Sequence, residues 1–572
     1  MKISNHPPWL STKKNNYTNL RVESLSLIMA DDAETPMLLV RAVDGAVDYK
    51  GHPASRSNTG RWRSASFIIG VEIAERFAYY GISSNLVTYL TGPLGQSTAA
   101  AAANINAWCG TALLLPLLGA SVADSFLGRY RTISMASLLY ILGLGLLTFS
   151  AVLPSLMDGF DSQTNMVTTA LFFFSLYLIA VAEGGHRPCA QAFGADQFDG
   201  QDPEECKSKS SFFNWWYFGV SAGATVTVMI LSYIQDNLSW VLGFGIPCIA
   251  MIIALVVFLA GTKTYRYSIG KNEKGPFVRI SSVFVAAFRN RQKTSPLDCH
   301  GFLSEQNYEQ FKFLNKAMVV CSIAEIEETK AVLRLVPIWS TCLVYGIVCA
   351  QISTLYIKQG ATMDRTVVSG FEIPPASLQC FMGITILVIL PMYDRIFVPI
   401  AKSLTTNPSG ITMLQRIGTG ILLSAISTIV AALVEMKRLK IAKEYDLVDK
   451  PSVTVPMSVW RLVPQYLIFG LADVFTLVGL QEFFYEQVPQ ELRSIGLALY
   501  LSVTGIGNFL SGIVISVIDN ATGGDGRDSW FSNNLNRAHL DYFYWLISGL
   551  SLIGFVTFLH FSKSYIYNRN VF

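Results

Sequence analysis

Twelve predominantly apolar runs dominate the sequence. A helix of about 20 residues spans the roughly 30 Å hydrocarbon core of a bilayer, so runs of this length predict membrane-spanning helices. They lie at residues 65–91, 100–123, 132–153, 167–192, 211–234, 239–261, 331–356, 375–398, 411–435, 458–483, 494–518 and 541–561. The expected fold class is therefore an all-α membrane protein with twelve transmembrane helices.

The composition agrees with this interpretation. Of the 572 residues, 51% are hydrophobic and only 15% are charged, whereas soluble chains carry roughly 25% charged residues. The formal net charge is +3, so no basic surface predicts binding to nucleic acid. The nine cysteines lack the spacing of a zinc or haem site, and most lie within apolar runs.

A long polar stretch divides the runs into two groups of six, an arrangement typical of transporters. Within this stretch, residues 281–292 predict an amphipathic helix on the membrane surface. The expected organisation is a disordered cytoplasmic tail (1–60), an N-terminal six-helix bundle (61–261), a cytoplasmic linker (262–330), a C-terminal six-helix bundle (331–561) and a cytoplasmic tail (562–572).

Basic residues predict the orientation in the membrane. The linker carries eleven lysines and arginines, and the connection between the second and third runs carries Arg129 and Arg131. An excess of positive charge marks cytoplasmic loops, so both loops belong in the cytoplasm. An even number of spans then places both termini there too. One loop disagrees, because four basic residues fall on the predicted outer side: Lys437, Arg438, Lys440 and Lys443.

Three charges interrupt the first run. A charge at the bilayer centre costs about 2.5 to 3.5 kcal/mol on insertion scales. Glu72, Glu75 and Arg76 therefore require either partners of opposite charge or a functional role. Residues three and four apart share one face of a helix, where Arg76 can neutralise one glutamate but not both. Burial and surplus negative charge favour a protonated carboxyl group, so the cluster predicts a site that binds and releases a proton. A buried ion cluster that only fixes helix packing is the alternative.

Two single charges lie in opposite halves of the chain. Arg187 lies near the end of the fourth run, and Asp473 is the only acid between Trp460 and Gln481. A buried charge needs a partner of opposite sign, and pairing these two side chains would connect the halves. His186 has no second histidine or cysteine at ligand spacing, so no metal site is expected.

Several motifs resemble the plant nitrate/peptide transporter family, within the proton-coupled oligopeptide transporters of the major facilitator superfamily. They are the ExxER motif at Glu72, Glu75 and Arg76, GASVADSFLGRYRT at 119–132 between the second and third helices, SFFNWWYF at 211–218 in the fifth helix, and LRLVPIW at 333–339 opening the seventh. The resemblance implies two six-helix bundles around a central cavity that opens alternately to either side. It also implies proton symport through the two glutamates, with the proton as coupling ion and no cofactor.

Departures from the family pattern bear on mechanism and substrate. The usual lysine of helix four is Arg187 here, and the usual glutamate of helix ten is Asp473. Arginine does not deprotonate in practice, so the carboxylates must carry the proton. Peptide-transporting relatives have a second arginine seven residues after the ExxER arginine, where this chain has Ser83. A histidine associated with nitrate binding in some relatives aligns with Cys349, which argues against high affinity for nitrate but does not exclude nitrate.

The expected function is proton-coupled symport of a small anionic solute, and nitrate is the first candidate substrate. We do not expect an enzymatic reaction. A plant hormone, a specialised metabolite or a di- or tripeptide is the alternative substrate, and a membrane receptor or scaffold without transport is the alternative class. Candidate substrate-binding residues are Tyr79, Tyr80, Asn214, Trp215, Cys349, Gln351, Gln481 and Phe483. The glycines at 184–185 and 505–507 predict close helix packing and not a phosphate loop.

The tail contains a candidate sorting signal. Glu34 precedes Leu38 and Leu39 in a spacing that resembles acidic dileucine signals for vacuolar sorting in plants. We expect a multi-pass protein of the vacuolar membrane or the plasma membrane, surrounded by lipid. Its cytoplasmic segments offer contacts for a kinase or a sorting adaptor.

Replacing both Leu38 and Leu39 by alanine should move a fluorescent fusion of the full chain from the vacuolar membrane to the plasma membrane, because the adaptor loses its apolar contact. Confocal imaging beside markers of both membranes measures the change. Replacing Leu25 and Leu27 of the same tail by alanine is the matched control. An unchanged distribution after the change at residues 38 and 39 would contradict the sorting role.

Overall fold

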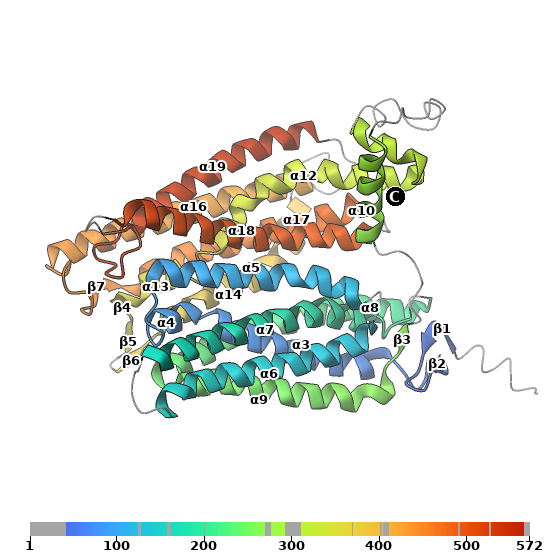
Figure 1. Ribbon diagram of the computed structural model, residues 1–572, viewed down its shortest axis with the longest axis horizontal. Coiled ribbons are helices and arrows are strands. Elements are labelled where there is room, and N and C mark those ends of the chain that lie inside the picture. The colour runs from blue at the N-terminus through green and yellow to red at the C-terminus, as the bar shows by residue number, and fades with distance from the viewer. Residues whose placement is uncertain are drawn as a thin grey trace, which may run out of the picture.

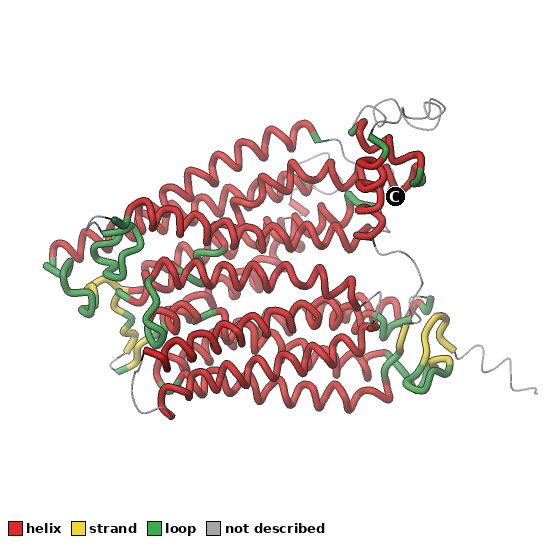
Figure 2. Tube along the Cα trace, viewed as in Figure 1, coloured by secondary structure: helices red, strands yellow, loops and turns green. Residues whose placement is uncertain are grey.

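The computed structural model describes residues 42–123, 127–156, 162–199, 201–268, 276–291, 311–368, 370–397, 399–400, 403, 411–489, 492–524 and 528–565. Helices dominate this part of the chain, and short strands lie at the two ends of the molecule (Figure 2). Eleven of the described helices are long and apolar enough to cross a membrane. The expectation of an all-α membrane protein is confirmed.

The first half of the chain forms the N-terminal bundle, which lies below in Figure 1. Its helices are α3 (Arg61–Ser83), α4 (Leu86–Thr91), α5 (Thr98–Val122), α6 (Arg129–Leu156), α7 (Ser162–Ala195), α8 (Pro203–Asn237) and α9 (Trp240–Ala260). Helix α7 packs on both α5 and α6, while α3 packs on α7, α8 and α9. This packing places the charged face of α3 against α7.

The second half forms the C-terminal bundle. Its helices are α12 (Ile323–Cys349), α13 (Leu355–Ala361), α14 (Cys380–Met392), α16 (Met413–Glu444), α17 (Val463–Glu486), α18 (Arg493–Thr522) and α19 (Leu540–Ser564), with the short elements η5 (Pro375–Gln379), η6 (Tyr393–Phe397) and η7 (Val459–Leu462). Helix α16 packs on α17 and α19, and α12 packs on α18 and α19. Each of the twelve predicted runs overlaps a helix of the structure.

Helix α3 is the expected first span, although it is not among the eleven because of its charges. The predicted run is broken after Ser84, where the side-chain amide of Gln379 in the other bundle donates a hydrogen bond of 2.8 Å to the Ser84 carbonyl. A helix end leaves carbonyl groups without intrahelical partners. The C-terminal bundle thus satisfies one backbone group at the end of α3.

The segment before α3 is ordered by strand pairing. Strand β1 (Ala42–Val47) pairs antiparallel with β2 (Pro53–Ser55) and with β3 (Tyr267–Ser268), which follows η2 (Gly261–Thr264). The expectation of a disordered tail over residues 1–60 is therefore wrong for residues 42–60. Strands this short are hard to recognise from the local sequence. In addition, β3 lies more than 200 residues after β1 in the chain. The rest of the tail, including the candidate sorting signal, lies outside the described residues.

An ion pair anchors this small sheet. The buried guanidinium of Arg266 contacts the carboxylate of Glu205 at 2.6 Å and donates a hydrogen bond to the carbonyl of Gln197. Gly60 has φ +77°, and a Cβ there would lie 2.2 Å from Nε of Arg266. Glycine is thus required both for the backbone conformation and for the close approach of the arginine.

The linker between the bundles packs onto the second one. Helix α10 (Pro276–Arg289) confirms the expected amphipathic helix but begins five residues earlier than predicted. Its buried face packs with η4 (Lys312–Val319) and the start of α12. Helix α12 begins at Ile323 with a capping box formed by Ser322 and Glu325, so the predicted boundary at residue 330 is about two helical turns too late.

The four basic residues that disagreed with the predicted orientation lie in α16, and one of them is a neutralised arginine. Arg438 is fully buried in α16, where it pairs with Glu435 at 2.6 Å and donates hydrogen bonds to Asn536 and to the carbonyl of Leu535. A buried, paired arginine adds no net charge to this end of α16. The disagreement is therefore weaker than the count of basic residues implied.

The two bundles meet at the end of the molecule where β4 (Met363–Asp364) pairs with β7 (Val455–Ser458) and β5 (Thr366–Val368) with β6 (Phe371–Glu372) (Figure 1). There Lys358 donates a hydrogen bond of 3.1 Å to the Thr91 hydroxyl, and the backbone of Thr98 donates one of 3.0 Å to Asn533. These contacts close the interface at this end.

Helices α5 and α18 form a close contact between the bundles along their lengths. A Cβ on Gly110 would lie 2.8 Å from the carbonyl oxygen of Gly505. The fully buried amides of Asn106 and Gln351 both donate hydrogen bonds to the hydroxyl of Ser511, at 3.0 and 2.8 Å. The predicted role of the glycines at 505–507 in close packing is confirmed.

Replacing Gly507 by valine should destabilise the protein, because a Cβ there would lie 2.4 Å from Cα of Gly346 in α12. Overpacking of this kind costs about 1 to 3 kcal/mol. Thermal unfolding of the detergent-solubilised full chain measures the loss. Gly549→Ala is the control, since a Cβ there meets nothing within 4 Å, and an equal melting temperature for both variants would contradict the packing argument.

Candidate proton-coupling site

The charges of α3 form a buried cluster around one guanidinium group. Arg76 contacts the carboxylate of Glu75 at 2.6 Å and that of Glu72 at 3.8 Å. The side chains of all three residues are exposed by 3% or less. The predicted cluster on one helix face is therefore present, and Arg76 approaches both glutamates of the motif.

A third carboxylate completes the cluster. Oε1 of Glu183 on α7 lies 3.1 Å from the guanidinium of Arg76 and 3.5 Å from that of Arg187, one helical turn further along α7. Sequence reasoning missed Glu183. The available signal was a lone acid in an apolar run four residues before Arg187, a spacing that favours an ion pair on one helix face.

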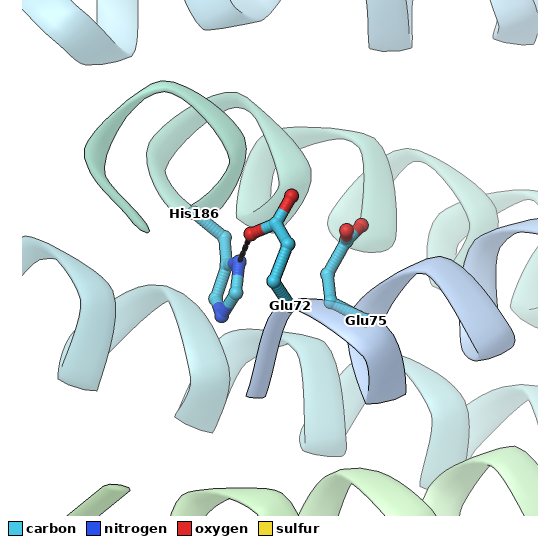
Figure 3. A group of neighbouring side chains, drawn as sticks. All are labelled: Glu72, Glu75 and His186. Carbon is cyan, nitrogen blue, oxygen red and sulfur yellow. Dashed lines mark ion pairs between the residues drawn. The ribbon is translucent and has the colours of Figure 1, made fainter. Parts of the chain in front are cut away.

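The imidazole ring of His186 lies at the same place. Its Nδ1 lies 3.9 Å from Oε2 of Glu72, and Glu75 lies beside them (Figure 3). Within the part of the chain that the structure describes, neither ring nitrogen of His186 makes a hydrogen bond, and one carboxylate oxygen each of Glu72, Glu75 and Glu183 is also unpaired and buried. The cluster therefore has free acceptor sites that face its interior.

The formal charges of the cluster do not balance. Three carboxylates share two guanidinium groups, so the fully ionised cluster carries one surplus negative charge. An uncompensated buried charge is costly. Binding one proton removes the surplus, so the arrangement can store a proton in the membrane-spanning region.

A metal ion fits the cluster less well than a proton does. Ligand atoms of Glu72, Glu75 and His186 lie within 4.8 Å of one another, which is close enough for a shared ion. However, Arg76 contacts the other oxygen of both carboxylates, and its charge opposes a divalent cation. The expectation that no metal binds stays a prediction.

Small residues allow α7, which carries Glu183 and Arg187, to lie close against α5. A Cβ on Gly184 would lie 2.7 Å from Cβ of Leu115, and one on Gly119 would lie 2.0 Å from the carbonyl oxygen of Gly184. Helices α5 and α7 can approach this closely only because both positions are glycine. The predicted packing role of the glycines at 184–185 is confirmed, and Gly119 of the loop signature takes part in it.

The chain matches the POT family over residues 130–531. It belongs to this family. It is similar to the Arabidopsis thaliana protein NRT1/PTR FAMILY 5.10, with 62% identity over 94% of this chain and 98% of that protein. It is also similar to NRT1/PTR FAMILY 5.14 of the same plant, with 57% identity over 92% and 97% of the two chains.

Solved structures of POT family transporters share the fold. One is an autoinhibited peptide transporter of the family, with a TM-score of 0.70 and 21% identity over 89% of this chain and 98% of that one. PepTSo matches with a TM-score of 0.68 and 20% identity over 88% and 98%. The protein is therefore a proton-coupled transporter of the POT and NRT1/PTR family with the major facilitator fold, as the resemblance implied.

Arg187 and Asp473 are not paired with each other among the described residues of this POT family member. Arg187 contacts Glu183 of its own bundle and is 31% exposed. Asp473 accepts a short hydrogen bond from the hydroxyl of Tyr345, whose ring stacks on Phe469 at 5.6 Å. Pairing across the bundles stays a prediction for another conformation.

Other predicted site residues lie near Arg187 and Asp473. The Tyr80 hydroxyl lies within electrostatic range of both Arg187 and Asp473, and the thiol of Cys349 within range of Asp473. Tyr79 is 7% exposed and stacks on Trp108 at 5.6 Å. Tyr80 and Cys349 thus remain candidates for substrate contact, whereas Tyr79 supports the core beneath them.

Two predicted substrate-binding residues are packed inside the protein in this conformation. Phe483 is fully buried and packs against Phe484 and Tyr565. Gln351 is fully buried and bound to Ser511 at the contact of α5 and α18. In both cases side-chain type and span position gave no information on which face of the helix turns inward.

The last three predicted residues differ in what the structure describes. The ring of Trp215 is 60% exposed and lies edge-on to Phe218. Gln481 is exposed near the end of α17. The side chain of Asn214 lies outside the described part of the chain.

Exchanging the two central charges should restore contact if they pair during transport. Arg187→Ala or Asp473→Ala alone should abolish accumulation, since losing one partner of a buried pair costs about 3 to 5 kcal/mol. Arg187→Asp combined with Asp473→Arg should recover part of it. Proton-driven uptake by proteoliposomes measures both effects, and a double mutant no better than the worse single mutant would contradict the pairing.

Proposed function

We propose that the protein is a proton-coupled symporter for a small anionic solute, with nitrate as the first candidate. The observation that carries this proposal is the cluster in which three carboxylates meet two guanidinium groups, of which Arg187 is partly exposed. The cluster supplies proton sites, and Arg187 supplies a permanently charged group for an anion. Arg187 makes its ion pair within the cluster, so proton binding and anion binding can influence each other.

The side chain at position 83 favours a small anion over a peptide. It is a buried serine, and serine offers no charge to hold the carboxylate of a dipeptide. Peptide transport is the second candidate, because the solved POT family structures that share this fold include peptide transporters. A plant hormone or another organic anion is the third candidate, supported by the exposed ring of Trp215.

The distribution of basic residues supports a cytoplasmic position for the end that carries β1 to β3 and α10. The opposite end, where the bundles are joined by Lys358 and Thr98, then faces away from the cytoplasm. In this orientation the structure represents a state closed to the outer or luminal side. The membrane proposed is the vacuolar membrane, with the plasma membrane as the alternative.

An uptake screen with the purified, reconstituted protein tests the proposal. Proteoliposomes with a neutral interior are placed in acidic medium that contains isotope-labelled nitrate, a dipeptide or an organic anion. Nitrate accumulation that collapses with a protonophore is the expected result. Accumulation of the dipeptide but not of nitrate would favour the second candidate, and accumulation of none of the solutes under a proton gradient would favour a receptor or scaffold.

Glu75→Gln should abolish uphill uptake and leave solute binding partly intact, because the amide keeps the shape of the side chain but cannot bind the proton. Glu72→Gln should have a milder effect, since Glu72 lies 3.8 Å and not 2.6 Å from Arg76. Glu444→Gln removes an exposed carboxylate and serves as the control. If both cluster variants still accumulate the solute against its gradient, the proton sites lie elsewhere.

A further inference from the structure

Glu183 connects the proton site with the group proposed to bind the anion. One of its oxygens, Oε1, lies 3.1 Å from Arg76 and 3.5 Å from Arg187, and the other is buried without a partner among the described residues. Arg76 has a second close partner in Glu75, at 2.6 Å. Arg187 makes no ion pair with any other described residue. A change in the charge of Glu183 therefore affects Arg187 more than Arg76.

We propose that Glu183 is a third proton-coupling residue, whose ionised form holds Arg187 and whose protonated form releases Arg187 to the transported anion. This inference rests on the proposed function, because it assigns a role within anion symport. It gives Glu183 a task distinct from that of the two glutamates on α3. Those two balance Arg76, whereas Glu183 competes directly with the anion for Arg187.

The surroundings of Glu183 support this assignment. The titratable and charged groups that face it are Glu72, Glu75, Arg76, Tyr79 and Tyr80 of α3, Cys109 of α5, Tyr140 of α6 and Arg187 of α7. Tyrosine and cysteine are uncharged at neutral pH. The charge of Glu183 therefore interacts mainly with the charges of two arginines and two other carboxylates.

Charge balance leads to a coupling ratio. The ionised cluster carries one surplus negative charge, and a monovalent anion at Arg187 adds a second. Two protons are then needed to neutralise the loaded site, one on the α3 glutamates and one on Glu183. The empty site returns in its ionised form, so two protons move with each anion and the cycle transfers one net positive charge. In Glu183→Gln the cluster starts without a surplus, so one proton suffices and transport becomes electroneutral.

The test compares the wild type with Glu183→Gln and Glu183→Asp in proteoliposomes, with nitrate as the probe. For the wild type we expect nitrate binding to weaken with rising pH by up to about a hundredfold per unit, the limit for two linked protons at tenfold each. In Glu183→Gln this dependence should fall to at most tenfold per unit, uphill accumulation should fall at least tenfold, and nitrate exchange without a gradient should persist. The ratio of protons to nitrate, measured from the reversal of flux, should fall from two to one.

Two controls separate this role from a structural one. Glu183→Asp keeps an ionisable group, so it should retain the pH dependence, with a shifted midpoint, even if Glu183→Gln folds poorly. Glu435→Gln removes another fully buried carboxylate that pairs with an arginine on its own helix at 2.6 Å. It should lower the melting temperature but leave the pH dependence and the coupling ratio unchanged.

Infrared spectroscopy separates this inference from the proposed function. A pH titration without any anion follows the carbonyl band of protonated carboxyl groups, and Glu183→Gln should remove one titrating group from it. If the wild type does not transport nitrate, the proposed substrate is wrong, while loss of that group still supports Glu183 as a proton site. An unchanged band in Glu183→Gln, or an unchanged coupling ratio of two, would overturn the inference.

Discussion

The contacts of one guanidinium group govern the arrangement of the N-terminal bundle. Arg76 is buried and charged, and it stays buried because Glu72, Glu75 and Glu183 surround it. An arginine in an apolar environment requires such compensation. The contact of α7 with α3 through Glu183 follows from this requirement. With Arg187 counted as well, the three carboxylates exceed the two guanidinium groups by one negative charge. One bound proton can neutralise that surplus.

The sequence allowed a good prediction of what depends on local pattern. The twelve spans follow from run length, and the joint location of Glu72, Glu75 and Arg76 follows from helical spacing. Glu183 could not be placed with them, because its contact with Arg76 depends on the packing of α3 against α7. The sequence of a single helix does not show which neighbouring helix its polar side chains will contact.

The same limit explains the other differences. Phe483 and Gln351 lie on helix faces that pack inward, and hydrophobicity alone does not distinguish a cavity face from a core face in a membrane bundle. The pairing of β1 with β3 joins segments more than 200 residues apart. Neither strand is long enough to be recognised without its partner. Contacts between segments distant in the chain therefore determine these features, and the local sequence pattern does not predict them.

The contact between α5 and α18 differs from the cluster in one physical respect. Its closest approaches involve glycine backbone, and its polar groups are the amides and the hydroxyl of Asn106, Gln351 and Ser511. None of these groups titrates in the physiological range. These groups keep the same charge in acidic and in neutral surroundings. The close contact of α5 and α18 is therefore independent of the proton that the cluster binds, so the joint between the bundles and the acid–base chemistry use separate sets of residues.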